Sequence, residues 1–424
     1  MITPLEQRVV DQVDTLTDDM VAFTRSLIRL PTVNPPGEAY EPCARLVGEH
    51  LKSLRMEVAY LVAEGHADHS SRYPRVNVMG RLGGAVPMPT LHLNGHTDVV
   101  PAGEGWTVDP FEGVVREGRI YGRGACDMKS GIAAAVFACA AIQAAGIRLG
   151  GSLEISATVD EESGGFAGMA YLAEQGLVSA KRTSYVIIPE PLNVNRICLG
   201  HRGVYWFQID TYGRIAHGSM PFLGKNAIDL MGKILSGIDE RLRPLLSQRW
   251  TTMPVEPVQA RQATLNVNGI FGGQARPGVG SPCVADRCSA IFDRRFLKEE
   301  PFEAVRAEVS DLIESLRQGD PALDARITDL MVVHPVETSR DTDLVRATAR
   351  AITDVLDTAP DFVASPGTYD HKHVFNIGKI DQCVAYGPGL LHLAHQPDEY
   401  CEISHLVQSC KVIALTIVRL LGTV

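Results

Sequence analysis

Short apolar runs alternate with helical patterns through the first 200 residues, and this alternation restricts the chain to few folds. Helical spacing of apolar residues appears near residues 5–30 and 38–55, and again in the small-residue segment Gly131–Ala145. Between and after these segments come runs typical of strands, at Val58–Val62, Val76–Met79, Leu91–Asn94, Ser152–Val159 and Tyr185–Ile188. Strands that alternate with helices predict an α/β layer architecture with a largely parallel sheet.

The pattern changes after Gly200. The expected elements then follow the order β-α-β-β-α-β, at Val204–Thr211, Ala227–Leu242, Ala263–Ile270, Cys288–Phe292, Phe302–Leu316 and Ala325–Val333. This order is typical of a ferredoxin-like split unit. Helices near Asp343–Leu356 and Ile403–Leu421 then resume the first pattern. We therefore expect a larger discontinuous domain, residues 1–201 and 336–424, interrupted by a small α+β domain at 202–335.

Composition excludes several classes of protein. The 424 residues carry a formal net charge of −10, which argues against nucleic acid as a main partner. Nine scattered cysteines without a CxxC pair favour reduced thiols over disulfides or a zinc–thiolate site. The polar N-terminus does not resemble a signal peptide, and no apolar run reaches about 18 residues. The expectation is a cytoplasmic protein without a membrane span.

Polar residues that suit a metal site follow several of the expected strands. His96 and Asp98 share one face of an extended segment, and a histidine ligand commonly donates its second ring N–H to a carboxylate. A histidine in a surface loop beside an aspartate is the simpler interpretation of that pair alone. Asp127 lies among glycines that permit a sharp turn, although an acid at a helix start is also ordinary.

Three consecutive acids end another strand, in the segment Asp160–Gly165. Such a cluster needs a cation or full solvation, and of Glu161 and Glu162 one can bind metal while the other accepts a proton. Glu190 ends a further strand, and His395 lies in a polar turn. Open sheets bind ligands at the carboxyl ends of their strands. Two histidines and three carboxylates there predict two divalent ions about 3.5–4 Å apart, with one carboxylate shared.

The motifs together identify a family. The segments GHTDVVP, GRGACDMKSG, DEESGG, IPEP, RIAHGSMP, DRR, YGPG and AHQPDE cover nearly the whole chain. The chain resembles the M20 metallopeptidase family, which contains acetylornithine deacetylase, succinyl-diaminopimelate desuccinylase, aminoacylase and glutamate carboxypeptidase. The resemblance implies a hydrolase-like mixed-sheet catalytic domain with an inserted ferredoxin-like domain. It also implies that this inserted domain acts as a lid and forms a homodimer.

The resemblance also implies residue roles. Asp127 would bridge two metals, with His96 and Glu190 completing one site and Glu162 and His395 the other. Glu161 would be the general base. Asp98 would orient His96, and His217 would reach the partner's active site and stabilise an oxyanion. Arg295 would hold a substrate carboxylate. Gly367, Thr368 and Gly387 would line the cleft. A salt bridge between Arg295 and Asp293 is the alternative interpretation of that arginine.

Two departures from the family pattern concern the substrate. The usual lid asparagine is absent before Cys283–Cys288, and Ala285 stands where proline is usual. Tyr369, His371 and His373 are unusual at their positions; they indicate either loop packing or a pocket remodelled for an aromatic acid.

The expected activity is metal-dependent cleavage of a C–N bond, with the amide of an N-acyl amino acid or a similar carboxylate-bearing small molecule as substrate. One alternative is an aminohydrolase that releases ammonia from a nitro-substituted aminobenzoate; another is a dipeptidase or carboxypeptidase. A metal-free binding protein is disfavoured because every ligand position and Glu161 are intact. Three carboxylates and two imidazoles suit zinc, and also manganese or cobalt.

Overall fold

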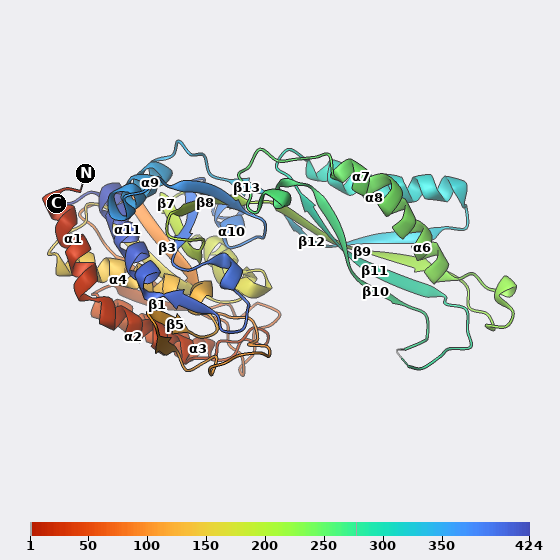
Figure 1. The fold of residues 1–424 in the computed structure, drawn as a ribbon, viewed down its shortest axis with the longest axis horizontal. Helices are drawn as coiled ribbons and strands as arrows, with labels where there is room; N and C mark the ends of the chain where they lie inside the picture. Colours follow the sequence, from red (N-terminus) through yellow and green to blue (C-terminus); the bar gives the residue numbers. More distant parts are fainter. Residues whose placement is uncertain (1, 277) are drawn as a thin grey trace. The chain divides into compact units, whose positions relative to one another are not determined.

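The computed structural model describes residues 2–276 and 278–424, which form two compact units (Figure 1). Unit 1 comprises the described residues of Met1–Gly200, Thr338–Val363 and Tyr369–Val424. Unit 2 comprises those of His201–Glu337 together with Ala364–Thr368. The short return segment therefore belongs with the inserted part of the chain, and it includes Gly367 and Thr368.

A mixed sheet forms the centre of unit 1. Its strands lie in the order β1 (Glu57–Val62), β2 (Val76–Leu82), β6 (Ser152–Thr158), β3 (Thr90–His96), β7 (Tyr185–Pro191), β15 (Cys383–Gly387) and β8 (Arg196–His201). The short strands β13 (Val336–Glu337) and β14 (Asp361–Ser365) each pair with β8. The pairs β6–β3, β3–β7 and β7–β15 are parallel, whereas β1–β2, β2–β6 and β15–β8 are antiparallel. The expectation of a largely parallel sheet thus applies only to its centre.

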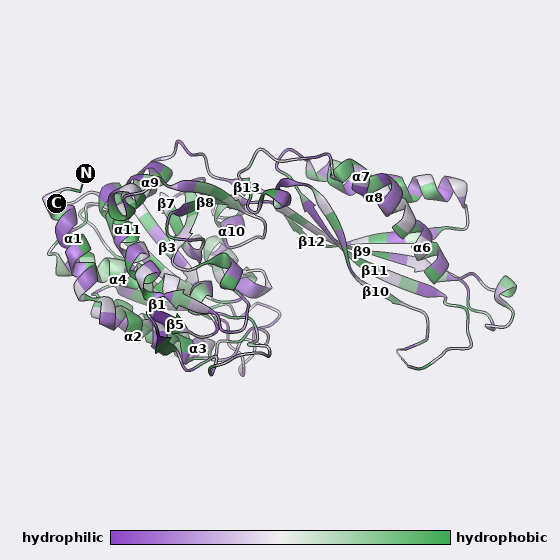
Figure 2. Cartoon of the chain, in the orientation of Figure 1, coloured by the Kyte–Doolittle hydropathy of each residue, from purple (hydrophilic) through white to green (hydrophobic). Residues whose placement is uncertain are grey.

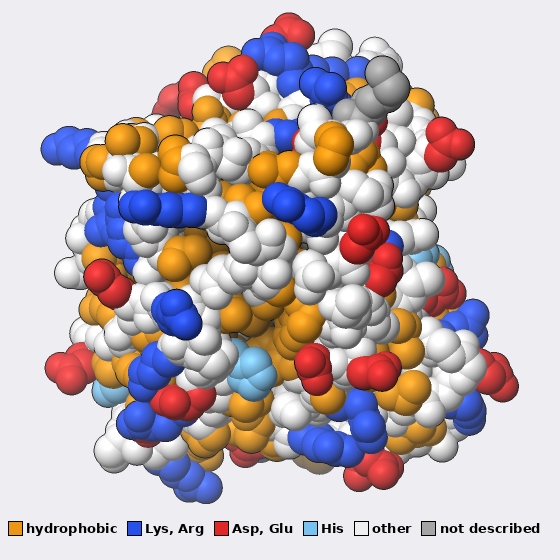
Figure 3. Space-filling model, turned by 90° about the vertical axis from the view of Figure 1, so that its left-hand side faces the viewer, with side chains coloured by type: hydrophobic (Ala, Val, Ile, Leu, Met, Phe, Trp, Pro, Cys, Tyr) orange, Lys and Arg blue, Asp and Glu red, His pale blue; other side chains and the backbone are white. Residues whose placement is uncertain are grey.

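Helices surround this sheet. They are α1 (Pro4–Thr15), α2 (Thr17–Ile28), α3 (Tyr40–Ser53), α4 (Ser130–Ala144), α5 (Tyr171–Glu174), α9 (Asp343–Leu356), α10 (His371–Asn376) and α11 (Ile403–Leu421). The small-residue helix α4 is buried on nearly every side, because α11, α1 and the sheet all pack against it. Its residues accordingly show almost no polar face (Figure 2). On the side of unit 1 that carries the termini, basic and acidic side chains are interspersed (Figure 3).

Two helices are long and apolar enough to cross a membrane, Ala125–Ala144 and Ile403–Leu421. The expectation that no segment has this length and apolarity is therefore wrong. In the most apolar window of the first helix, 89% of the residues are buried inside the protein, against 56% for the second. Burial of this extent is typical of a core helix, since an all-round apolar helix can be enclosed by a large core instead of lipid.

A small second sheet in unit 1 brings two distant segments together. Its strands β16 (Tyr400–Glu402), β5 (Arg119–Tyr121) and β4 (Val114–Arg116) were not expected from the sequence. Tyr400 pairs with Tyr121, so the turn that contains His395 lies near the glycine-rich segment that contains Asp127. Three-residue strands are too short to show a periodic pattern, which explains why they escaped prediction.

Unit 2 is an antiparallel sheet covered by helices. The sheet has the order β10 (Thr264–Gly272), β11 (Arg287–Phe296), β9 (Gly203–Tyr212) and β12 (Asp324–Val333). The helices α6 (Ala227–Gly237) and α8 (Phe302–Gly319) supply its other layer, and a short helix α7 spans Arg243–Leu246. The chain order is β-α-β-β-α-β. Its core includes the stacked rings of Phe207 and Phe292, whose centroids are 5.0 Å apart.

A buried ionic cluster stabilises the central sheet beneath the site described below. Glu154 on β6 is fully buried, and both Arg81 and Arg182 approach its Oε1 to 2.6 Å. His92 on β3 lies 3.2 Å from the other oxygen. Burial raises the pKa of Glu154, but His92 and Arg182 more than offset this effect and lower the pKa to about 2.

This lowered pKa predicts a pH-dependent stability. A carboxylate whose pKa falls on folding contributes free energy above its unfolded pKa, near 4.5, and loses that contribution as the pH falls toward 2. The shift corresponds to about 3 kcal/mol. We expect Glu154→Gln to weaken the loss of stability between pH 5 and pH 2, measured by urea unfolding. Glu49→Gln, which removes an exposed partner of Lys52, should follow the wild type. Equal pH profiles for wild type and Glu154→Gln would contradict this account.

Candidate metal centre

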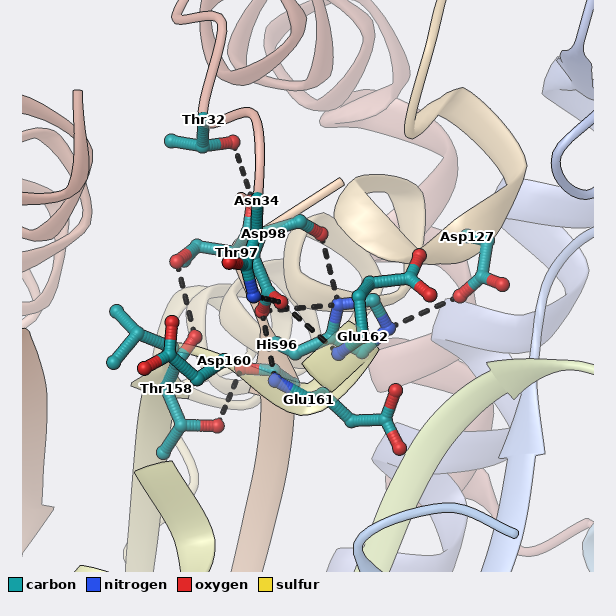
Figure 4. A network of polar contacts seen from close by, with 12 residues as sticks. Thr32, Asn34, His96, Thr97, Asp98, Asp127, Thr158, Asp160, Glu161 and Glu162 are labelled. Atoms are coloured by element: carbon teal, nitrogen blue, oxygen red, sulfur yellow. Dashed lines mark hydrogen bonds and ion pairs between the residues drawn. The ribbon is translucent and has the colours of Figure 1, made fainter. Parts of the chain in front are cut away.

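The five predicted ligands meet in unit 1 as two trios. In the first, the ligand atoms of His96, Asp127 and Glu190 lie within 4.8 Å of one another; in the second, the same holds for Asp127, Glu162 and His395. Asp127 belongs to both. Its Oδ1 lies 3.0 Å from Nε2 of His96 (Figure 4). Its Oδ2 lies 3.6 Å from Nε2 of His395. One carboxylate thus directs one oxygen toward each trio.

Strand ends position three of these ligands. His96 is the last residue of β3, and Glu190 lies near the end of its parallel neighbour β7. Glu162 lies in the turn Glu161–Ser163, directly after β6. The carboxyl ends of parallel strands meet at one edge of a sheet, so these side chains converge there.

Irregular backbone positions the other two ligands. Asp127 (φ −115°, ψ 97°) and Met128 (φ −133°, ψ 35°) both depart from helical geometry within Ala125–Lys129, so the Asp127 side chain leaves the helical path. Gly124 precedes it with φ +81°, and a Cβ at Gly124 would lie 2.5 Å from Cγ1 of Val99. Only glycine fits this turn. His395 has φ +63°, in the left-handed region.

Asp98 supports both His96 and the acidic loop. Nδ1 of His96 donates to the main-chain oxygen of Asp98 at 3.0 Å, which leaves Nε2 facing Asp127, while the Asp98 carboxylate is 3.6 Å away. That carboxylate instead accepts the backbone N–H groups of Glu161 and Glu162, at 3.1 and 3.0 Å, and Nδ2 of Asn34 at 3.1 Å (Figure 4). The contact between Asp98 and the loop was not foreseen from the sequence.

The charge balance of the centre suits divalent cations. Burial, together with the charge of Asp127, raises the pKa of Glu162 to about 7 and that of Glu190 well above its usual value. Buried carboxylates shift in this way when they lack sufficient positive charge. The donor set of imidazole nitrogens and carboxylate oxygens is one that zinc, manganese and cobalt accept. Residues and charge therefore both fit two divalent ions.

Glu161 lies next to the ligands but belongs to neither trio. Its carboxylate and that of Glu162 leave the loop in different directions (Figure 4). Burial raises the pKa of Glu161, and the ammonium group of Lys372, 3.6 Å from its Oε1, opposes that effect. A carboxylate beside a metal cluster but outside its ligand set is available to accept a proton.

Gly387 contributes by close packing. It ends β15, and a Cβ there would lie 2.2 Å from the carbonyl oxygen of Pro189. A side chain at this position would therefore separate β15 from β7 next to Glu190. This role in packing was not part of the sequence prediction, which assigned Gly387 to the lining of the cleft.

The predicted residues of unit 2 have local partners. Nδ1 of His217, which is exposed, accepts from the Ser219 hydroxyl at 2.8 Å. Arg295 donates from Nε and Nη2 to the two oxygens of Asp293, at 2.8 and 2.9 Å. The salt bridge considered as the alternative for Arg295 is thus present. The backbone N–H of Gly367 donates to Ser365, and Thr368 follows at the end of the same segment.

The three unusual residues near the cleft motif are buried. The Tyr369 hydroxyl lies 3.4 Å from Sγ of Cys198 and 3.2 Å from Nδ1 of His371. Nε2 of His373 donates to the carbonyl oxygen of Gly164 at 2.6 Å. These contacts favour loop packing over the pocket for an aromatic acid that the sequence also allowed.

A buried ion pair behind the centre was missed. Glu399 accepts the backbone N–H groups of Cys126 and Asp127, at 2.8 and 3.0 Å, and Arg123 donates to its other oxygen at 2.5 Å. Both side chains are almost fully buried. The only sequence signal was an acid four residues after His395 in AHQPDEY. This pair fixes the backbone that carries the shared ligand.

The arrangement of ligands and the acidic loop agrees with one protein family. The model of peptidase family M20/M25/M40 matches residues 92–419. The chain belongs to this family. It is a metal-dependent hydrolase of C–N bonds, as the resemblance implied. An acetylornithine deacetylase of Myxococcus xanthus is 30% identical over 82% of this chain and 85% of its own.

Further similarities extend over the whole length. An N-formyl-4-amino-5-aminomethyl-2-methylpyrimidine deformylase of Bacillus subtilis is 27% identical, covering 93% of each chain. Human carnosine dipeptidase 1 has a TM-score of 0.76 at 19% identity, over 99% of each chain. A dinuclear metal-binding peptidase of the M20 family from Bacillus subtilis has a TM-score of 0.70 at 17% identity, over 97% of this chain and 100% of its own. These structures share the fold of this family member.

Proposed function

We propose that this M20-family hydrolase is a deacylase that cleaves the amide bond of an N-acyl amino acid or a similar carboxylate-bearing small molecule. The observation that carries the proposal is the pair of ligand trios sharing Asp127, with Glu161 beside them. The related deacetylase and deformylase, both of which are named for removing an acyl group from nitrogen, support it.

The cofactor in this proposal is a pair of divalent ions. His96, Asp127 and Glu190 would hold one ion, and Asp127, Glu162 and His395 would hold the other. Zinc is the first candidate, with manganese or cobalt as alternatives. When bound, such ions polarise the substrate carbonyl and lower the pKa of water toward 7. The similar dinuclear peptidase supports the number of ions.

The chain's own residues carry the proton and position the substrate. Glu161 takes a proton from the attacking water and delivers it to the leaving nitrogen. Asp98 holds His96 and the loop that carries Glu161 in one arrangement. His217, from a partner subunit, donates to the developing oxyanion. Arg295 exchanges Asp293 for a substrate carboxylate and grips it with two hydrogen bonds.

The remaining parts of the proposal concern organisation. Residues 202–335 act as a lid and dimerisation domain on a catalytic domain of residues 1–201 and 336–424. Gly367, Thr368 and Gly387 line the substrate cleft. The enzyme is a cytoplasmic homodimer that acts on a small molecule, and neither nucleic acid nor a membrane is its partner. Family membership and the two compact units support this organisation.

One observation favours a second candidate substrate. Asp293 already accepts hydrogen bonds from Nε and Nη2 of Arg295. A substrate without a carboxylate would not have to displace Asp293 from this arginine. The related deformylase is named for an N-formyl aminomethylpyrimidine substrate. N-formyl groups on heteroaromatic methylamines are therefore the second class to test.

A substrate panel tests both candidates. Apo-enzyme is loaded with Zn²⁺, Mn²⁺ or Co²⁺ and incubated with N-acetyl, N-succinyl and N-formyl amino acids, the N-formyl aminomethylpyrimidine, dipeptides and aminobenzoates. Release of amine from the N-acyl amino acids is the expected result. Turnover confined to the formylated pyrimidine selects the second candidate. Turnover confined to dipeptides or aminobenzoates rejects both, and full activity in metal-free protein rejects metal dependence.

A further inference from the structure

A tight turn at the start of α10 lies directly against the acidic loop Asp160–Gly165. Nζ of Lys372 is 3.6 Å from Oε1 of Glu161, and Nε2 of His373 donates to the carbonyl oxygen of Gly164 at 2.6 Å. The turn and the loop also touch at Gly165, where a Cβ would lie 2.4 Å from Oδ1 of Asp370. Three residues of the loop, Glu161, Gly164 and Gly165, thus lie against the start of α10.

The turn is itself fixed to the strand that carries His96. Oδ2 of Asp370 accepts from Nδ2 of Asn94 at 2.9 Å, and Asn94 lies two residues before His96 on β3. The side-chain oxygen of Asn94 accepts in turn from the hydroxyls of Ser156 and Thr158, at 2.7 and 3.1 Å. All of these side chains are buried. A hydrogen-bonded, buried chain of this kind holds one conformation.

Burial restricts where the Lys372 ammonium group can go. The residue is 5% exposed, and the Glu161 side chain is 11% exposed. Lysine is almost never buried to this extent without a partner. Among the residues that the structure describes, only Lys372 forms an ion pair with Glu161. Burial thus holds the Lys372 ammonium group beside the Glu161 carboxylate.

We propose that Lys372 is a positioning residue for Glu161: held by the Asp370 turn, its ammonium group keeps the Glu161 carboxylate beside the two ligand trios and in the direction needed to accept a proton. The proposal deepens the proposed function and rests on Glu161 as the base. Lys372 itself touches neither trio as a ligand.

Kinetic and metal-binding measurements on matched variants test this role. The variants are Lys372→Met, which removes the charge at similar length, Lys372→Arg, which keeps it, and Lys181→Met, which removes an exposed charge from unit 1. We expect Lys372→Met to lower kcat at least about tenfold, because displacing a catalytic group by about 1 Å is costly. KM should change less than about threefold, and titration of apo-protein with Zn²⁺ should still end at the wild-type stoichiometry. Lys372→Arg should recover most of kcat, and Lys181→Met should match the wild type.

A thermal double-mutant cycle on apo-protein tests the pair without any substrate. Lys372→Met leaves Glu161 buried without its partner, whereas Glu161→Gln in the same chain removes the unpaired charge. The double variant is therefore expected to melt above Lys372→Met alone, so that the single losses do not add. Additive losses, or a Lys372→Met enzyme with wild-type kcat, would overturn the proposal. If Lys372→Met does not fold, recovery of a folded double variant supports the pairing and its failure rejects it.

Different results would reject the proposed function and the role of Lys372. If wild-type enzyme turns over no compound of the substrate panel, the proposed function fails, while the melting cycle still reports on the pair. If wild-type enzyme is active but loses Zn²⁺ stoichiometry in Lys372→Met, the lysine stabilises the metal centre as a whole, and a specific role for it at Glu161 is rejected.

Discussion

Glu161→Gln is expected to lower kcat by about 10²–10⁴-fold without loss of bound metal. Glutamine keeps the size and one acceptor oxygen of glutamate but cannot accept the proton of the attacking water. Glu161 lies outside both ligand trios, so both metal sites keep all of their ligands. Its backbone N–H, which donates to Asp98, is also unchanged by the substitution. Steady-state kinetics and elemental analysis of the same preparation measure the two quantities together.

The controls separate a missing base from a damaged site. Glu162→Gln alters a ligand of the second trio and should reduce both metal content and turnover. Glu174→Gln, an exposed acid at the end of α5, should change neither. Turnover that survives in Glu161→Gln at normal metal content would assign the proton transfer to another group.

The convergence of the five candidate ligands was predictable because most of them depend on local sequence. Strand patterns predicted β3, β6 and β7, and His96, Glu162 and Glu190 lie at or just after the ends of these strands. The exact residue matters here, because side chains alternate between the two faces of a strand and a shift of one residue along it would point a side chain to the other face. Asp127 and His395 lay outside these strand patterns: the glycines around Asp127 and the polar turn of His395 made each a candidate, and the family resemblance implied their roles.

The supporting contacts could not be predicted because they join segments far apart in the chain. Glu399 and Cys126 are separated by 273 residues, and Asp370 and Asn94 by 276. Strands β5 and β16 bring the first two segments together, but each has three residues and no readable period. Lys372 had no sequence signal either, since its neighbours Tyr369, His371 and His373 appeared more unusual.

Arg295 illustrates a different limit. Its role as a carboxylate clamp and its salt bridge to Asp293 follow from the same three residues, Asp293-Arg294-Arg295. The structure contains the salt bridge. Residue type and spacing determine that the guanidinium needs an anionic partner, but they do not determine whether that partner is Asp293 or a substrate.

The buried pair of Arg123 and Glu399 leads to the second strong prediction. Arg123 also donates to the main-chain oxygen of Ala102 at 3.0 Å and lies over the ring of Trp106 at 5.2 Å. Arg123→Met would remove the partner of Glu399 and leave that carboxylate buried. Breaking a buried ion pair from one side costs about 3–5 kcal/mol. We expect this loss in the free energy of unfolding of the apo-protein, measured with urea.

The same substitution should also weaken the metal centre. Glu399 holds the backbone N–H groups of Cys126 and Asp127, and its displacement frees the segment that carries the shared ligand. Zn²⁺ titration of Arg123→Met should therefore show weaker binding at both sites, since Asp127 belongs to both trios. Loss at one site alone would contradict the shared role of Asp127.

A compensating substitution distinguishes charge from shape. In Arg123→Met/Glu399→Gln the neutral amide still accepts from both backbone N–H groups, but no charge remains unpaired. Replacing both members of a buried pair is often nearly neutral, whereas removing one is not. The double variant should thus regain most of the stability and Zn²⁺ affinity lost in Arg123→Met. If it is as unstable as Arg123→Met, the contacts of Arg123 with Ala102 and Trp106 matter more than its charge, because the double variant lacks these contacts as well.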